Sequence, residues 1–257
     1  MSKRVKFIIS SVILSLGFVA VQFIDTLPKI PLIFGLVFFT GLMAAWSFKE
    51  TLGKNMTWIS IILPMLFTLG VGLFWFLLPV SIFTRIPVIM FYFVGIYIML
   101  TTMNIYTVSS FKTIALLRAA RGVGFVMTLV ITFLIYDAIL SLRQNIFISS
   151  GLVFVSSFLL FLQGFWSIDL EERFDKKLFV MTLISALIML EINAMLFFWP
   201  ATVVVGSLFL TSGVYLLLGL GQAKLEERLF PSVIREYLTV GIVVLIGMFF
   251  ATSWGGK

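Results

Sequence analysis

Nine apolar stretches, each about 20 residues long, restrict the fold of this chain more than any other feature. A helix rises about 1.5 Å per residue, so about 20 residues cross the roughly 30 Å hydrocarbon core of a membrane. Inside that core a helix satisfies its own backbone hydrogen bonds. The sequence therefore predicts an all-α, polytopic bundle of nine transmembrane helices. Their approximate ranges are 6–24, 30–48, 57–78, 86–106, 122–142, 146–168, 178–199, 201–221 and 238–253.

The composition excludes an ordinary water-soluble protein. Of the 257 residues, 61% are hydrophobic and 11% are charged, whereas soluble domains carry about 25% charged residues. The connections between the apolar stretches are too short to fold as separate soluble domains. We therefore expect one integral membrane domain over residues 1–257, surrounded by the lipid bilayer. The formal net charge of +7 is explained by membrane orientation, and we expect no nucleic-acid partner.

Positive charges give the nine stretches an orientation, because cytoplasmic loops of membrane proteins carry an excess of Lys and Arg. With the N-terminus in the cytoplasm, fourteen of the 18 Lys and Arg residues fall in inside segments. An incorrect number of helices would invert the later segments and destroy this bias. The sequence thus predicts a cytoplasmic N-terminus, an external C-terminus and a multi-pass protein of the plasma membrane or a bacterial inner membrane. The four outside residues are Lys29, Arg85, Arg143 and Lys257.

A weak internal repeat runs through the chain. The sequence LEER occurs at Leu170–Arg173 and again at Leu225–Arg228, each time before another apolar stretch. Two other stretches end alike, with LFWFLLP at Pro79 and LFFWP at Pro200. After the first helix, the chain divides into four helical hairpins of one orientation, which is the pattern of a parallel repeat. Chance recurrence of short apolar words is the alternative to a true duplication.

The absence of His and Cys excludes several kinds of chemistry. It removes imidazole acid–base catalysis, thiolate nucleophiles and the commonest ligands of zinc. The sequence also has no Gly-rich phosphate loop of the GxxxxGK[ST] type. We therefore expect no metal site and no cofactor, and no residue stands out as catalytic.

Two carboxylates lie inside the apolar stretches. Glu191 precedes Trp199 by about eight residues, which places it roughly 12 Å from the outer boundary and close to the midplane. Asp137 lies only about 7–8 Å deep, where it can reach interfacial water or pair with Arg143. An ionised acid at the centre of a membrane helix costs on the order of 3 kcal/mol. We expect Glu191 to face the bundle, either as a neutral hydrogen-bonded acid or as a proton or cation site.

Two further residues accompany these acids. Asn193 lies two positions from Glu191 and therefore points about 200° around the helix. Aligning INAML with YDAIL places Asn193 opposite Asp137 in the repeat, so the three residues form a candidate ion, proton or ligand site. Pro64 interrupts the third stretch, and a proline inside a helix kinks it and frees a carbonyl one turn earlier. Packing alone also accounts for such a bend.

Three functions remain open. We expect a non-catalytic membrane subunit that assembles, anchors or regulates partners, through other membrane proteins or by self-association. The alternative is a small-solute or ion transporter that uses Glu191 as its proton- or cation-binding carboxylate. A lipid-modifying enzyme ranks third, since long exposed loops are almost absent. Convergence of Glu191, Asp137 and Asn193 on one cavity would favour transport, and Glu191 on a self-complementary outer surface would favour assembly.

Overall fold

The computed structural model describes residues 2–24, 28–50, 57–79, 82–110, 115–170 and 175–252. Within these ranges every regular element is a helix, and nine helical segments are long and apolar enough to cross a membrane. The predicted all-α bundle with nine spans is therefore confirmed, and the chain has the build of a multi-pass membrane protein. The elements are α1 Lys3–Phe23, α2 Lys29–Phe48, the 3-10 helix η1 Thr57–Ile61, α3 Ile62–Trp75, α4 Ile82–Ser109, α5 Leu117–Ser141, α6 Ile146–Asp169, α7 Lys176–Leu196, α8 Val203–Leu225 and α9 Pro231–Ala251.

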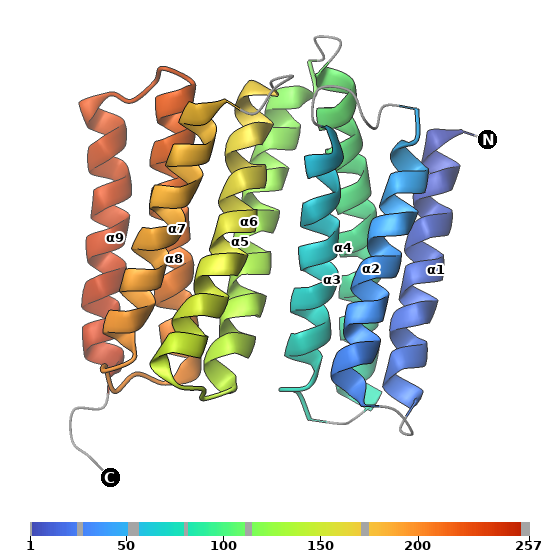
Figure 1. The fold of residues 1–257 in the computed structure, drawn as a ribbon, viewed down its shortest axis with the longest axis horizontal. Coiled ribbons are helices and arrows are strands. Elements are labelled where there is room, and N and C mark those ends of the chain that lie inside the picture. Colours follow the sequence, from blue (N-terminus) through green and yellow to red (C-terminus); the bar gives the residue numbers. More distant parts are fainter. Residues whose placement is uncertain are drawn as a thin grey trace. The chain divides into compact units, whose positions relative to one another are not determined.

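The chain divides into two compact units, and the division falls within α5. Unit 1 contains α1 to α4, η1 and the part of α5 up to Ile131, whereas unit 2 contains the rest of α5 and α6 to α9. Within each unit successive helices run in opposite directions (Figure 1). Sequence neighbours pack as hairpins in the pairs α2–α3, α6–α7 and α8–α9. A common origin of these hairpins stays a prediction.

Several helix ends differ from the limits of the apolar stretches. Helix α4 begins at Ile82, and α9 begins at Pro231, earlier than the sequence predicted. Pro231 occupies the first helical turn, where its missing N–H has no intrahelical partner to lose. Helix α7 ends at Leu196, and tight turns continue the chain to Trp199. Hydropathy locates the part of a helix that crosses lipid, whereas the polar terminal turns lie outside that signal.

Unit 1 is held together by hydroxyl groups at its centre. Helix α1 packs against α2 and α4, and α3 packs against the same two helices. Thr68 of α3 shares hydrogen bonds of 3.0 Å with Thr40 of α2 and with Tyr92 of α4. All three side chains are fully buried, and Phe18 of α1 stacks on the ring of Tyr92 at 4.7 Å between centroids. These bonds fix the rotation of three helices in a medium that offers no other hydrogen-bonding partner.

Unit 2 relies on glycines that let helices approach closely. A Cβ on Gly213 of α8 would lie 3.1 Å from the sulfur of Met189 of α7, and one on Gly164 of α6 would lie 2.6 Å from Leu218 of α8. Helix α8 therefore packs tightly against both α6 and α7. Helix α9 contacts α8, and Met248 is its one buried residue. Most of the surface of α9 is thus only partly buried or exposed.

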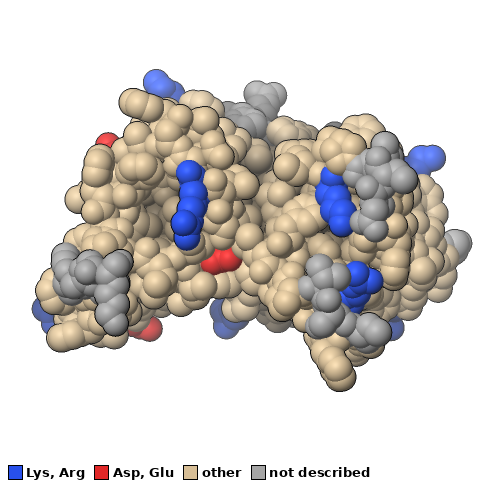
Figure 2. Space-filling view, turned by 90° about the horizontal axis from the view of Figure 1, so that it is seen from below, with Lys and Arg blue, Asp and Glu red and all other residues tan. Residues whose placement is uncertain are grey.

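Basic residues of unit 2 gather at one end of its helices. Figure 2 views the helix ends at the bottom of Figure 1 and shows isolated Lys and Arg side chains on a mostly uncharged surface. Among the described residues of unit 2, Arg143 is the basic residue at that end. This asymmetry agrees with the predicted orientation, which stays a prediction. The basic residues at the opposite end are Lys176, Lys177, Lys224, Arg228 and Arg235.

Cysteine labelling tests this orientation directly, because the natural chain has no cysteine. Gln144 and Lys177 are both exposed and lie at opposite ends of unit 2. We expect a membrane-impermeant maleimide to label Gln144→Cys in intact cells and Lys177→Cys only after the membrane is permeabilised. The reverse pattern would show that the N-terminus lies outside.

Candidate functional site

A cavity of about 520 Å³ lies in unit 2, where the α5–α6 turn and the α7–α8 turn come together. We call it the turn cavity. Its lining combines apolar side chains with the polar groups of Arg143, Gln144, Ser149 and Thr202, and it includes no Asp or Glu. The full lining consists of Ile139, Leu140, Arg143, Gln144, Ser149, Leu196, Phe197, Trp199, Ala201, Thr202, Val203 and Gly206.

Asp137 is buried between α5 and α8, with 5% of its surface exposed. Its Oδ1 accepts a hydrogen bond from the Ser207 hydroxyl at 3.2 Å. The same hydroxyl also lies 3.0 Å from the carbonyl oxygen of Val204, so its single proton is shared between two acceptors. The ion pair with Arg143 that the sequence suggested is not formed, because Asp137 instead turns toward α8.

Asn193 is buried between α7 and α6, with 1% of its surface exposed. Its Nδ2 donates to the hydroxyls of Ser149 at 3.1 Å and Ser150 at 3.0 Å. Its Oδ1 is buried and receives no hydrogen bond from any described residue. Ser149 also lines the turn cavity, so Asn193 positions one of the polar groups in the cavity wall.

The two polar contacts have a common geometry. Ser150 is the fifth residue of α6 and Ser207 is the fifth residue of α8, so each lies about 6 Å inside its helix. Sequence reasoning selected Asp137 and Asn193 but missed these serine partners. Each serine lies about one helical turn after the start of its helix, and the connection before that helix is short and either polar or proline-containing. This position was the signal in the sequence that could have identified the two serines.

Glu191 lies on the exposed face of α7 and does not join Asp137 and Asn193. It forms no hydrogen bond or ion pair with any residue in the described part of the chain. The sequence led us to expect an inward-facing acid, but Met189 and Asn193 occupy the buried side of this helix. Because α7 is apolar on every side, its hydropathy pattern does not select the buried face.

Apolar side chains surround Glu191 along that exposed face. Met195 and Phe198 follow it toward the end of α7 and are 74% and 78% exposed. Leu187, Ile184 and Val180 precede it and are also exposed. Glu191 lies five residues before the end of α7, about 8 Å inside the helix. The carboxylate therefore interrupts a stripe of exposed apolar side chains, which follow one another at intervals of three or four residues.

Pro64 lies in the first turn of α3, directly after η1. The third span therefore consists of a 3-10 segment followed by an α-helix, and Pro64 stands where the two meet. Its carbonyl accepts a hydrogen bond of 3.1 Å from the Thr68 hydroxyl. Pro64 is thereby linked to the hydrogen-bonded hydroxyls of Thr40, Thr68 and Tyr92 at the centre of unit 1. This contact serves helix packing.

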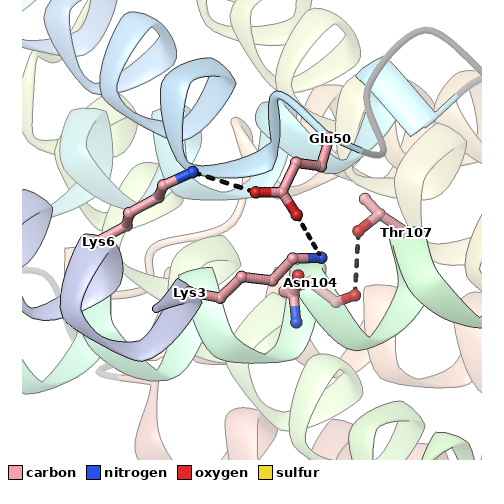
Figure 3. Close-up of polar contacts among 5 residues, drawn as sticks. All are labelled: Lys3, Lys6, Glu50, Asn104 and Thr107. Carbon is pink, nitrogen blue, oxygen red and sulfur yellow. Dashed lines mark hydrogen bonds and ion pairs between the residues drawn. The ribbon is translucent and has the colours of Figure 1, made fainter. Parts of the chain in front are cut away.

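A second polar cluster lies in unit 1, at the start of α1 and the end of α2 (Figure 3). Glu50 lies 3.3 Å from the Nζ of Lys6 and 3.7 Å from that of Lys3. The hydrogen bond from Lys6 and the charge of Lys3 lower the pKa of Glu50 below its ordinary value of 4.5. Lys6 also lies over the ring of Trp46 at 5.8 Å. This exposed cluster ties two helix ends together and carries the features of a structural contact.

Comparison with known proteins gives one match. A family model described as "Protein of unknown function (DUF5656)" matches residues 32–251. Searches of curated proteins and of solved structures found no match. The matched range includes Asp137, Glu191, Asn193 and the whole turn cavity.

The Glu50 cluster predicts a pH-dependent effect of Glu50→Gln on stability. The pKa of Glu50 is lowered by folding, so its contribution is present above about pH 4.5 and is lost as the pH falls further. We expect the variant to unfold at a slightly lower temperature than the parent at pH 7 and at the same temperature near pH 3. Thermal unfolding in detergent across this range measures the difference. A Glu50→Gln effect that persists at pH 3 would contradict an ion-pair origin, and Glu236→Gln serves as the control.

Proposed function

The chain belongs to the DUF5656 family, and we propose that it is a non-catalytic membrane subunit that binds a partner transmembrane helix along the exposed face of α7. Glu191 is the polar anchor of this contact. The partner that fits is a transmembrane helix with a Lys or Arg at the depth of Glu191. The exposed carboxylate within an apolar stripe is the observation that carries the proposal.

The cost of exposing a carboxylate to lipid supports a partner at this position. An ionised acid at the centre of a membrane helix costs on the order of 3 kcal/mol and one nearer the helix end costs less, and such residues normally pair or face a wet cavity. Glu191 has no partner among the described residues of unit 2, because Asn193 and Met189 take the buried side of α7. A basic side chain from a second protein would remove this cost and would fix the register of the two helices.

Charge complementarity favours a different protein over a second copy of this chain. Across the described residues, Lys and Arg occur only within the first or last five residues of helices and in the connections between them. A second copy would therefore bring no basic group to the depth of Glu191. A symmetric contact would instead bring two Glu191 side chains together, which like charges oppose.

Two apolar hollows, both lined by Ile192, the residue after Glu191, suit the side chains of such a partner. They measure about 330 and 230 Å³ and lie between α7, α8 and α9. Ile192, Phe209 and Leu245 line both of them. Apolar helix surfaces resemble lipid tails, so burying them against each other gives little net attraction in a membrane. Helix association in lipid therefore depends on close packing of side chains into such hollows.

The arrangement gives less support to the alternatives. Transport through Glu191 calls for a shared aqueous path with Asp137 and Asn193, and these two residues are buried on other faces. A lipid-modifying enzyme calls for nucleophilic or acid–base groups that meet in one site, and the turn cavity contains no carboxylate. We place the subunit in the plasma membrane or a bacterial inner membrane with the basic helix ends in the cytoplasm.

Energy transfer between labelled molecules in liposomes tests this function. The probe is a synthetic poly-leucine transmembrane helix with one Lys at the depth of Glu191, five residues from the matching helix end, and the matched probe has Leu in its place. We expect the Lys probe to associate with the parent and to lose at least about tenfold in affinity with Glu191→Leu, since charged hydrogen bonds contribute about 1.5–3 kcal/mol. Glu191→Gln is expected to lie between the two, because it keeps a hydrogen-bonding group without the charge.

The control variant is Glu236→Gln on α9, whose carboxylate is also exposed but lies near the start of that helix. We expect it to bind the Lys probe like the parent. Association of the Lys probe that is equally strong in Glu191→Leu would refute the proposal. Self-association of the parent that Glu191→Leu abolishes, with no binding of the probe, would replace it with a homo-oligomer.

A further inference from the structure

The turn cavity has a polar wall whose side chains favour an anion. Arg143 supplies hydrogen-bond donors, Gln144 donates one of its amide hydrogens to the carbonyl of Leu142 at 3.3 Å, and no acidic residue is present in the lining. Arg143 forms no ion pair with any residue that the structure describes. Arg143 is exposed and lines a cavity of about 520 Å³, a volume typical of small-molecule sites.

A helix N-terminus adds to this positive character. Thr202 caps α8 and, with Val203, lines the cavity. Amide groups in the first turn of a helix have no intrahelical acceptor, and the helix dipole places a partial positive charge there. The Thr202 hydroxyl accepts a hydrogen bond from the backbone N–H of Val205 at 3.4 Å. The backbone N–H groups that precede Val205 in this turn are therefore the ones that a ligand can reach. Together with the guanidinium, they form the usual surroundings of a phosphate group.

The backbone of Arg143 is left-handed, with a φ of 47°, just after α5, where glycine is the common residue. Leu170 and Glu227 have the same conformation after α6 and α8, so this geometry ends helices and limits which substitutions at position 143 are free of strain.

The rest of the lining is apolar, as an amphiphile requires. Leu140, Leu196 and Phe197 provide hydrocarbon contacts, and Trp199 provides an aromatic ring. The Trp199 Nε1 donates to Thr252 Oγ1 at 2.8 Å, which holds the ring at the end of the helices, where tryptophan favours the headgroup level. One wall thus suits acyl chains while Arg143 suits a polar head.

We propose that the turn cavity binds a phosphate group, in the form of a phosphodiester lipid headgroup or of free phosphate, through Arg143 and the N-terminus of α8. Ser149, which Asn193 holds in place, contributes a hydroxyl to the same wall. The phosphate contact does not depend on the proposed function, since Arg143 and the N-terminus of α8 belong to neither the exposed stripe around Glu191 nor the two apolar hollows. Leu196 and Trp199 line both the turn cavity and one of those hollows.

Ligand-dependent thermal unfolding of the purified full-length protein in detergent tests the proposal. The probes are dihexanoylphosphatidylglycerol, phosphate-free dihexanoylglycerol and inorganic phosphate. We expect phosphatidylglycerol to raise the unfolding temperature of the parent, and Arg143→Gln to weaken its apparent affinity about tenfold. Arg143→Asn, which tolerates the left-handed backbone, is expected to show the same loss and keeps the test valid if the Gln variant folds poorly.

The control is Arg85→Gln on α4, in unit 1, where Arg85 lies 5.3 Å from the ring of Phe23. It is expected to bind phosphatidylglycerol like the parent. An Arg143-dependent response to inorganic phosphate supports the proposal with free phosphate as the ligand, and a response to phosphatidylglycerol alone supports it with lipid. Equal responses of parent and both Arg143 variants, equal stabilisation by dihexanoylglycerol, or no response at all would overturn it.

Discussion

The structure depends on how polar groups are satisfied in a medium without water. Lipid tails resemble leucine side chains, so apolar contact alone does not hold membrane helices together. In unit 1, the hydroxyls of Thr40, Thr68 and Tyr92 join three helices at the centre. In unit 2, serines of α6 and α8 bind Asn193 and Asp137, while Gly213 and Gly164 let helices approach closely. The same rule makes a polar group without a partner the most informative feature of such a protein.

Four polar groups in unit 2 differ in how they meet this rule. Asp137 accepts a hydrogen bond from Ser207 and Asn193 donates to two serines through its amide nitrogen, so both help to hold the helices. Glu191 has no partner among the described residues and lies on the surface of α7. Arg143 likewise has no ion pair but lies beside a cavity. The first two residues join helices within unit 2, and the last two are the groups through which a partner helix and a phosphate group are proposed to bind.

Much of the fold could be predicted from the sequence, because hydropathy alone identifies stretches that lipid can surround. The rotation of α7 could not be predicted, since its apolar residues cover every side of the helix. The small and polar residues Thr182, Ser185, Ala186 and Asn193 share its buried side, and their helical spacing was the usable signal. The turn cavity depends on two turns that are separated in the sequence by the α6–α7 hairpin, so no local sequence pattern predicts it. The sequence indicates Arg143 only as an outside charge and a possible partner of Asp137, because its place in the lining of a cavity depends on the tertiary structure.

The outward orientation of Glu191 is the central claim, and spin-label accessibility along α7 tests it most directly. Single cysteines can replace Leu187, Glu191, Met195, Met189 and Asn193 without competing thiols, because the natural chain has none. In liposomes that contain this protein alone, the account predicts frequent collisions with dissolved oxygen for labels at positions 187, 191 and 195. It predicts rare collisions at 189 and 193. A label at position 191 as protected as those at 189 and 193 would place Glu191 inside the bundle and contradict the account.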